Sequence, residues 1–182
     1  MSELRFRLSD VFVDDAAAAF AEHKRRILER LPDVEVHHTG GTSIPGVLTT
    51  GDVDLHVRVE TRSFELARDA LCELYVPFHI DAWHSEGAFF TAPGSRPPVE
   101  VALTAIGGLD DLHHGEAWHR IAANSDLIDR YNAVKRKHEG GSIDEYLAAK
   151  RAFFYENFGS SLRGRFLHRS RSRRARWLRE DR

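Results

Sequence analysis

Two aspartates at alternate positions of one apolar segment are the residues of this chain best suited to chemistry. Asp52 and Asp54 stand at the start of the apolar alternation from Val53 to Val59. A strand sends residues two apart to the same face, so both carboxylates are expected to point the same way. Carboxylates this close repel each other, and a divalent cation with oxygen ligands relieves the repulsion. The pair therefore predicts a site for a divalent cation, whereas the alternative is a turn aspartate followed by a solvated strand residue.

A glycine-rich turn lies about ten residues before the aspartates. Gly40 and Gly41 follow the predicted strand 34–39 and precede Thr42 and Ser43. Glycines let backbone N–H groups approach an anion closely, and the Ser43 hydroxyl adds a further donor. These four residues are therefore predicted to contact the phosphates of a nucleotide, unless the segment is an ordinary turn.

An acidic residue and a lysine further along the chain fit the same chemistry. Glu100 lies between Val99 and Val101, a pattern typical of a carboxylate that points out of a buried strand. It is predicted to complete an ion site or to act as a base, and the alternative is an exposed strand residue. Lys135, on a predicted helix, is a candidate contact for a triphosphate, although a solvated helix lysine has the same pattern.

The eleven histidines do not form a zinc-binding pattern. His37 and His38 are adjacent on a predicted strand and therefore face opposite sides, which tetrahedral zinc ligands rarely do. His56 shares the predicted face of Asp52 and Asp54, where it could hydrogen-bond a metal-bound carboxylate. The favoured interpretation of His56 is nevertheless a surface histidine.

The order of these residues resembles that of a known superfamily. A glycine pair after a strand, Asp-x-Asp about ten residues later and a lone acidic residue in a later strand resemble the nucleotidyltransferases of the DNA polymerase beta type. More narrowly, HTGGTSIPGV resembles the H-x-G-S-T-S-V-P-G-L signature of the GrpB family (UPF0157). Two Tyr-x-x-x-Lys helices, at Tyr131 and Lys135 and at Tyr146 and Lys150, extend the resemblance over about residues 8–158.

The resemblance implies a Mg²⁺-dependent nucleotidyltransferase that moves a nucleoside monophosphate from an NTP to a hydroxyl acceptor. It assigns Asp52, Asp54 and Glu100 to catalysis and to two ions, which such sites hold about 3.5–4 Å apart. The family usually reads P-G-L-x-x-K-P-x-I-D, whereas this chain has Thr50 in place of the lysine and Asp52 in place of an apolar residue. Asp52 moves the chain toward the catalytic pattern of the superfamily. A noncatalytic nucleotide-binding or accessory module is the alternative function.

The elements that must position these residues follow from periodicity and turn signals. Strands are expected at 34–39, 53–59, 78–83, 87–92 and 99–104, and helices at about 14–30, 63–74, 115–123, 126–138 and 143–157. This order predicts an α+β fold in which helices pack on one side of a mixed sheet and a helical C-terminal lobe follows. The sheet would present the carboxylates, and the helical part would form the other wall of a cleft, a favoured place for ligands.

Composition predicts one domain followed by a basic segment. The chain has 182 residues, 42% hydrophobic and 30% charged, enough for one sizeable core. We expect a domain over 1–158, with a sheet part to about 106 and a helical part from 107. Residues 159–182 are expected to be an arginine-rich helix or tail, and the last twenty residues of the chain carry a charge of +7. That segment could bind RNA through phosphates or dock on the domain with its arginines solvated.

The expected compartment is the cytoplasm. No apolar stretch has the length of a transmembrane helix, and the charged N-terminus lacks the apolar core of a signal peptide, so no membrane partner is expected. Cys72 is the single cysteine, which excludes an internal disulfide, and its helical context predicts a reduced, packed thiol.

Overall fold

A five-stranded mixed sheet organises the computed structural model, which describes residues 3–158. The strands follow the order β2 (Glu35–Thr39), β4 (Val53–Val59), β7 (Val99–Ala105), β6 (Gly87–Ala92) and β5 (Val76–Phe78). β4 and β7 are parallel, and the other neighbouring pairs are antiparallel. The parallel pair therefore lies inside the sheet, with a strand on either side of it.

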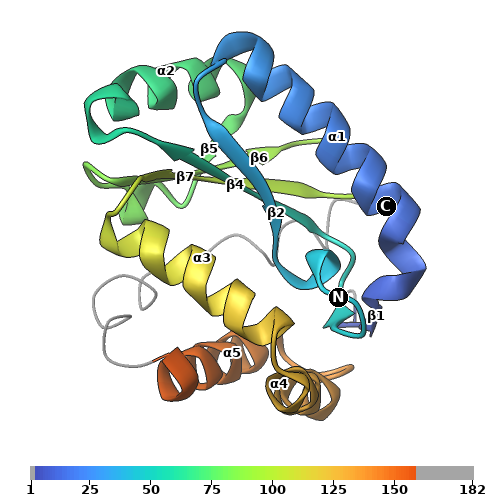
Figure 1. The fold of residues 1–182 in the computed structure, drawn as a ribbon. Coiled ribbons are helices and arrows are strands. Elements are labelled where there is room, and N and C mark those ends of the chain that lie inside the picture. Colours follow the sequence, from blue (N-terminus) through green and yellow to red (C-terminus); the bar gives the residue numbers. More distant parts are fainter. Residues whose placement is uncertain (1–2, 159–182) are drawn as a thin grey trace.

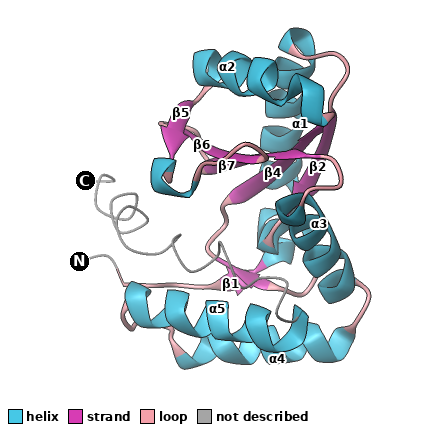
Figure 2. Ribbon diagram, turned by 90° about the vertical axis from the view of Figure 1, so that its left-hand side faces the viewer, coloured by secondary structure: helices cyan, strands magenta, loops and turns pink. Residues whose placement is uncertain are grey.

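Helices cover both faces of this sheet. They are α1 (Val13–Arg30), α2 (Phe64–Leu74), α3 (Leu109–Ala122), α4 (Ser125–Lys137) and α5 (Ile143–Phe158). α1 and α2 lie on one face, and α3 crosses the opposite face (Figure 1). α4 and α5 extend this second side beyond the sheet (Figure 2). Among the described residues, no helix is both long and apolar enough to cross a bilayer.

The period of two along β4 separates a core face from a polar face. Val53, Leu55, Val57 and Val59 are at most 1% exposed and pack with residues of α1 and α2 in one apolar cluster. Burying a valine or leucine side chain contributes about 1.5–3 kcal/mol, so this face alone fixes the register of the strand. The residues between them point to the other face, toward α3.

A second apolar cluster holds the C-terminal helices together. Tyr131 of α4 lies between Phe153 and Phe154 of α5, with ring centroids 5.0 and 5.6 Å away. α4 begins where the Asn124 side chain accepts hydrogen bonds from the amides of Asp126 and Leu127, at 3.0 and 3.3 Å. Capping and aromatic packing thus place this helix pair opposite the polar face of the sheet.

A small sheet joins the N-terminus to the glycine-rich region. β1 (Arg7–Leu8) pairs antiparallel with β3 (Leu48–Thr49). Neither strand was predicted. Each has only two residues, too few for alternation to be recognised.

The α+β class and most predicted elements agree with the structure, and four details differ. Helices were expected on one side of the sheet, but they cover both faces, because α3 packs against the polar face through the contact of Asp111 with Arg58. The predicted strand 78–83 is wrong, because β5 ends at Phe78, where His79 adopts a left-handed conformation with φ of 50°. α3 begins at Leu109 rather than at 115, because the Asp111 carboxylate in its first turn accepts from the Gly107 amide at 3.0 Å. Cys72 is exposed rather than packed.

Candidate functional site

The register of the parallel strands sets two of the predicted carboxylates side by side. Asp54 of β4 pairs with Glu100 of β7, so both side chains lie on the polar face of the sheet. On the flanking strands, Thr39 pairs with Asp54 and Thr91 pairs with Glu100. A row of four polar residues therefore crosses four strands at one level of the sheet.

Asp54, Thr91 and Glu100 of this row form one wall of a cleft between the sheet and the C-terminal helices. Asp52, Asp54 and Glu100 line the cleft together, as does Gly41 from the glycine-rich turn. The opposite wall includes Lys135 of α4 and Lys150 of α5. The structure thus brings five of the eight predicted site residues to one cavity, with three carboxylates and two ammonium groups on its walls.

The glycine pair lets the turn pack directly against the row. Gly40 has φ of +81° and ψ of −171°, a conformation that is essentially restricted to glycine. A methyl group at Gly40 would stand 1.9 Å from Oδ2 of Asp54. One at Gly41 would stand 3.0 Å from Cβ of Thr49 and 3.6 Å from Nζ of Lys135. Glycine is therefore needed at both positions for steric reasons, most severely at Gly40.

Hydroxyl groups of the turn hold its own backbone and the first aspartate. The Thr42 hydroxyl donates to the Asp52 carbonyl at 2.9 Å, and the Ser43 hydroxyl donates to the Gly40 carbonyl at 2.8 Å. The Thr50 hydroxyl donates to the Asp52 carboxylate. The two positions at which the sequence departs from the GrpB pattern therefore contact each other.

Lys135 is buried rather than solvated. The side chain is 3% exposed, its ammonium group donates to the Leu48 carbonyl, and Nζ lies 3.9 Å from the ring centroid of Tyr131. A cation at this distance from an aromatic face is attracted by the ring quadrupole. The buried position beside Gly41 agrees with a fixed cation at the predicted phosphate site.

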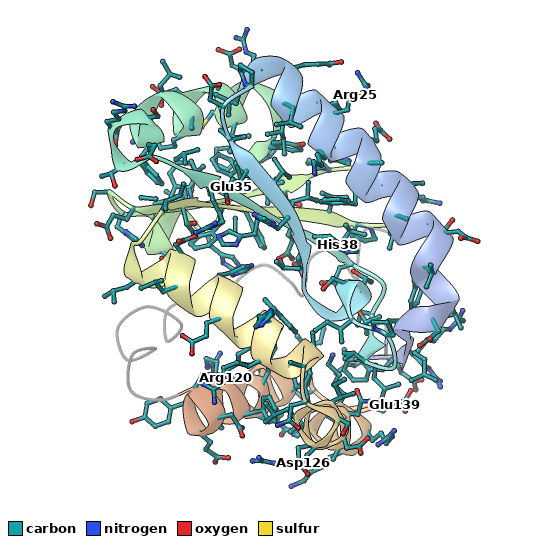
Figure 3. The ribbon with its side chains drawn as sticks, viewed as in Figure 1. Arg25, Glu35, His38, Arg120, Asp126 and Glu139 are labelled. Carbon is teal, nitrogen blue, oxygen red and sulfur yellow. The ribbon has the colours of Figure 1, made fainter. Side chains whose placement is uncertain are left out.

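A second polar group, the sealed cluster, occupies the other end of the same sheet face. It consists of His56, Arg58, Thr104 and Asp111. Arg58 donates to both carboxylate oxygens of Asp111, from Nε at 2.5 Å and from Nη2 at 2.9 Å. It also donates to Glu35 on β2, which Figure 3 labels. Thr104 donates to Asp111 at 3.2 Å. Burial of Asp111 would raise its pKa, but the bonds from Arg58 and Gly107 outweigh this effect and lower it.

The interpretation of His56 as a surface histidine is wrong. His56 is 1% exposed, and its Nε2 lies 2.8 Å from the Thr104 hydroxyl and 3.6 Å from Asp111 Oδ1. Burial lowers the pKa of His56 to about 4, so the ring is neutral at physiological pH. Its ring lies 4.6 Å from that of His114, whose Nε2 is 3.1 Å from the Thr39 hydroxyl. These rings connect the sealed cluster with the row that contains Asp54.

The carboxylates of the cleft fit magnesium by donor type and by their common face. Carboxylate oxygens are the ligands that Mg²⁺ prefers. Within residues 3–158, no three His, Cys, Asp or Glu side chains are grouped so that they could hold a metal ion as they stand. Because Thr50 donates to Asp52, a cation at this carboxylate would compete with that hydrogen bond. The donor set therefore suits the ion, and Asp52 is the residue that must adjust.

Sequence reasoning missed the apolar part of the cleft. Leu4, Phe6, Trp118, Ile143 and Leu147 line it together with Tyr131 and Tyr146 of the two Tyr-x-x-x-Lys helices. The available signal was the alternation of Leu4, Phe6 and Leu8 with arginines, which is typical of a strand. The arginine-rich segment 159–182, for which RNA binding or docking was expected, lies outside the described residues.

Comparisons with known structures identify the fold. The crystal structure of GrpB from Enterococcus faecalis matches with a TM-score of 0.59 and 17% identity, over 79% of this chain and 94% of that chain. A crystal structure of the Cid1 poly(U) polymerase with bound MgGTP matches with a TM-score of 0.53 and 13% identity, over 71% of this chain and 43% of that chain. At these identities the likeness concerns the fold, which is similar to that of a nucleotidyltransferase.

Sequence comparison identifies the family. A UPF0157 protein of Vibrio cholerae is 25% identical over 158 residues, which cover 87% of this chain and 84% of that protein. The family model described as GrpB protein matches residues 13–158, from the first residue of α1 to the last residue of α5. The chain therefore belongs to the GrpB family.

Proposed function

We propose that this protein is a nucleotidyltransferase that moves a nucleoside monophosphate from an NTP to a hydroxyl acceptor. The observation that carries the proposal is the pairing of Asp54 with Glu100 across two parallel strands, on the face that lines the cleft. Asp52 lines the same cleft. The fold supports the proposal, because a similar sheet occurs in the Cid1 poly(U) polymerase, crystallised with MgGTP.

The residues of the cleft have two proposed roles, metal binding and phosphate binding, which follow from their charges. Asp52, Asp54 and Glu100 would hold Mg²⁺, which neutralises phosphate charge and orients the reacting oxygens when it is bound. The backbone of Gly41 and the ammonium group of Lys135 would meet the phosphates, because a buried cation lies there beside a turn with glycine geometry. Lys135 would thereby replace the lysine that is absent at Thr50.

The transfer step is a displacement at the α-phosphorus. The acceptor oxygen forms a bond to this phosphorus, while the bond from phosphorus to the oxygen that bridges to the β-phosphate breaks with its electron pair. Pyrophosphate leaves, and the acceptor carries the nucleoside monophosphate. The hydroxyl proton passes to a carboxylate within the cleft, for which Glu100 is the candidate base, and from there to solvent.

The test follows two products of the reaction, namely pyrophosphate and the acceptor that carries a label from the α-phosphate. Each of the four NTPs would be incubated with the protein, Mg²⁺ and a panel of hydroxyl compounds that contains glycerol, glucose, adenosine and a short RNA. The proposal expects pyrophosphate release and transfer of an α-phosphate label to at least one compound. Label that stays with the nucleotide, with no pyrophosphate from any NTP, contradicts it.

A nucleotide-binding module without turnover is the second candidate. It is favoured by the Thr50 hydrogen bond to Asp52 and by the lack, within the described residues, of a ready group of three metal ligands. Such a module would bind NTPs with Mg²⁺ in the same cleft but would release no pyrophosphate. Replacing Thr50 by valine separates the two, because it removes this hydrogen bond to Asp52 and should raise turnover only in an enzyme.

A further inference from the structure

The N-terminal strap, residues 3–9, joins the two walls of the cleft. On the sheet side, β1 of the strap pairs with β3, and Ser9 donates from its amide to Val47 at 2.8 Å and from its hydroxyl to Ile44 at 2.7 Å. Figure 2 shows the strap running between the sheet and the C-terminal helices. The strap is therefore anchored beside the turn that precedes Asp52.

The other anchor of the strap is the loop after α4. The Leu4 carbonyl accepts from the Gly140 amide at 2.7 Å, and the Phe6 amide lies 3.4 Å from the Glu139 carboxylate, which Figure 3 labels. Hydrogen bonds at both ends fix the direction of the strap, and alternation then decides which side chains enter the cleft. Leu4 and Phe6 line it, whereas Arg5 and Arg7 are exposed.

The strap gives the cleft an apolar wall. Leu4 and Phe6 are 3% and 7% exposed and form one cluster with Tyr146 of α5. The rings of Phe6 and Tyr146 meet edge to face, with centroids 5.0 Å apart. Tyr146 lies one helical turn before Lys150, which also lines the cleft. The aromatic residue and the lysine thus lie about 6 Å apart along one helix face.

A ligand that fits this arrangement has an anionic part joined to a flat apolar part. We propose that Leu4, Phe6 and Tyr146 form the wall against which the nucleobase of the bound NTP lies, so that the N-terminal strap determines affinity for the nucleoside. The inference rests on the proposed function, because the triphosphate must lie beside Asp54 and Lys135. An aromatic base suits an aromatic pair, whose rings favour stacked or edge-to-face contacts, and such contacts tolerate any base.

The experiment separates the base from the phosphates. Dissociation constants for each MgNTP and for magnesium tripolyphosphate would be measured by calorimetry on the full chain and on strap variants. The wild type should bind at least one NTP about tenfold more tightly than tripolyphosphate, within the range of base–aromatic stacking. Phe6→Leu keeps an apolar side chain but removes the ring, so NTP binding should weaken about tenfold while tripolyphosphate binding stays unchanged.

Two further variants keep the result interpretable. Leu8→Ala changes a strap residue that is 46% exposed, and it should alter neither constant. Leu4→Val is a smaller change, for use if Phe6→Leu does not fold, and it should weaken only NTP binding.

Equal affinity of the wild type for NTPs and tripolyphosphate would overturn the base-binding wall but leave the proposed function standing. Equal weakening of NTP binding and tripolyphosphate binding by Phe6→Leu would have the same consequence. Absence of binding by every ligand would overturn the proposed function, and the inference with it.

Discussion

The two ends of one sheet face carry polar groups that differ in their surroundings. Asp54 and Glu100 form a pair at the cleft, and Arg58 and Thr104 form a pair four residues further along the same strands, about 13 Å away at 3.3 Å per residue. Asp111 closes the second pair, where it is 2% exposed and bound by a guanidinium, a hydroxyl and an amide. The first pair lines the cleft.

The contrast teaches that alternation alone does not distinguish a structural from a functional polar residue. Both pairs interrupt apolar strands in the same way, and both lie on the face opposite the core. The difference comes from α3, which supplies Asp111 to one pair and leaves space in front of the other. We expect the carboxylate held by the Arg58 guanidinium to stabilise the fold, whereas the carboxylates that line the cleft are the ones proposed to bind a ligand.

The largest effect is expected at the cleft. Asp54→Asn should abolish Mg²⁺-dependent pyrophosphate release, because the amide keeps the shape of the carboxylate but loses the charge that holds the ion. Removing one of several close like charges should leave the free energy of unfolding unchanged or slightly higher without Mg²⁺. Urea titration without Mg²⁺ tests this second part. A decrease of several kcal/mol would assign Asp54 to a structural network and break the comparison.

In the sealed cluster a substitution is expected to lower stability rather than pyrophosphate release. Asp111→Asn should lower the free energy of unfolding by about 3 kcal/mol, because the Arg58 charge loses its buried partner. The matched control is Glu35→Gln, which removes the exposed partner of the same guanidinium and should change stability by less than about 1 kcal/mol. Both would be measured by urea titration at pH 7. Equal effects of the two substitutions would show that burial does not distinguish these partners.

Acid should weaken the sealed cluster through His56. The pKa of His56 is about 4 in the folded protein, against 6.5 as its usual value, so the unfolded chain binds a proton first as the pH falls. Stability should therefore be fully present above pH 6.5 and decrease by up to about 3 kcal/mol toward pH 4.

The readout is the slope of unfolding free energy between pH 7 and pH 4.5. His56→Gln should flatten it more than His23→Gln or His38→Gln, although burial also lowers the pKa of those two histidines. An unchanged slope in His56→Gln would contradict a neutral, buried ring.

A smaller effect is expected from two glycines with similar φ. Gly46 has φ of +76°, and nothing lies within 4 Å of an added Cβ. Gly46→Ala should therefore lower the free energy of unfolding by only about 1 kcal/mol, which is the cost of a positive φ for alanine. Gly40→Ala meets the Asp54 carboxylate as well and should lower it by about 2 kcal/mol. It should also remove MgNTP binding, which Gly46→Ala retains. Equal losses, with nucleotide binding intact in both, would show that the contact with Asp54 does not shape the site.

Local patterns predicted the sheet where strands are long and alternating. β4 was predicted residue for residue, and β7 to within one residue, because each buries every second side chain. The end of β5 and the start of α3 were missed, because they depend on a left-handed His79 and on a hydrogen bond from the Gly107 amide to the Asp111 carboxylate. Such contacts leave no periodic signal.

The candidate site was likewise predicted only in part. The convergence of Asp52, Asp54 and Glu100 was expected from their order, and the structure places all three at one cleft. The burial of His56 was not foreseen, because its environment is set by α3 rather than by its own strand. Leu4 and Phe6 alternate with arginines, which is a strand signal, but their place at the cleft depends on pairing and hydrogen bonds with segments distant in sequence and was missed.

The central claim is that the end of the sheet face with Asp54 and Glu100 binds a magnesium nucleotide, whereas the end with the sealed cluster does not. The most direct measurement is the stabilisation of the wild type, Asp54→Asn and Asp111→Asn by each of the four NTPs with Mg²⁺. At 100 times the dissociation constant, a bound nucleotide should raise the free energy of unfolding of the wild type by about 2.7 kcal/mol. The same increase is expected for Asp111→Asn, although this variant is less stable without the nucleotide. No increase is expected for Asp54→Asn. Equal stabilisation of Asp54→Asn, or none of the wild type by any NTP, would contradict the claim.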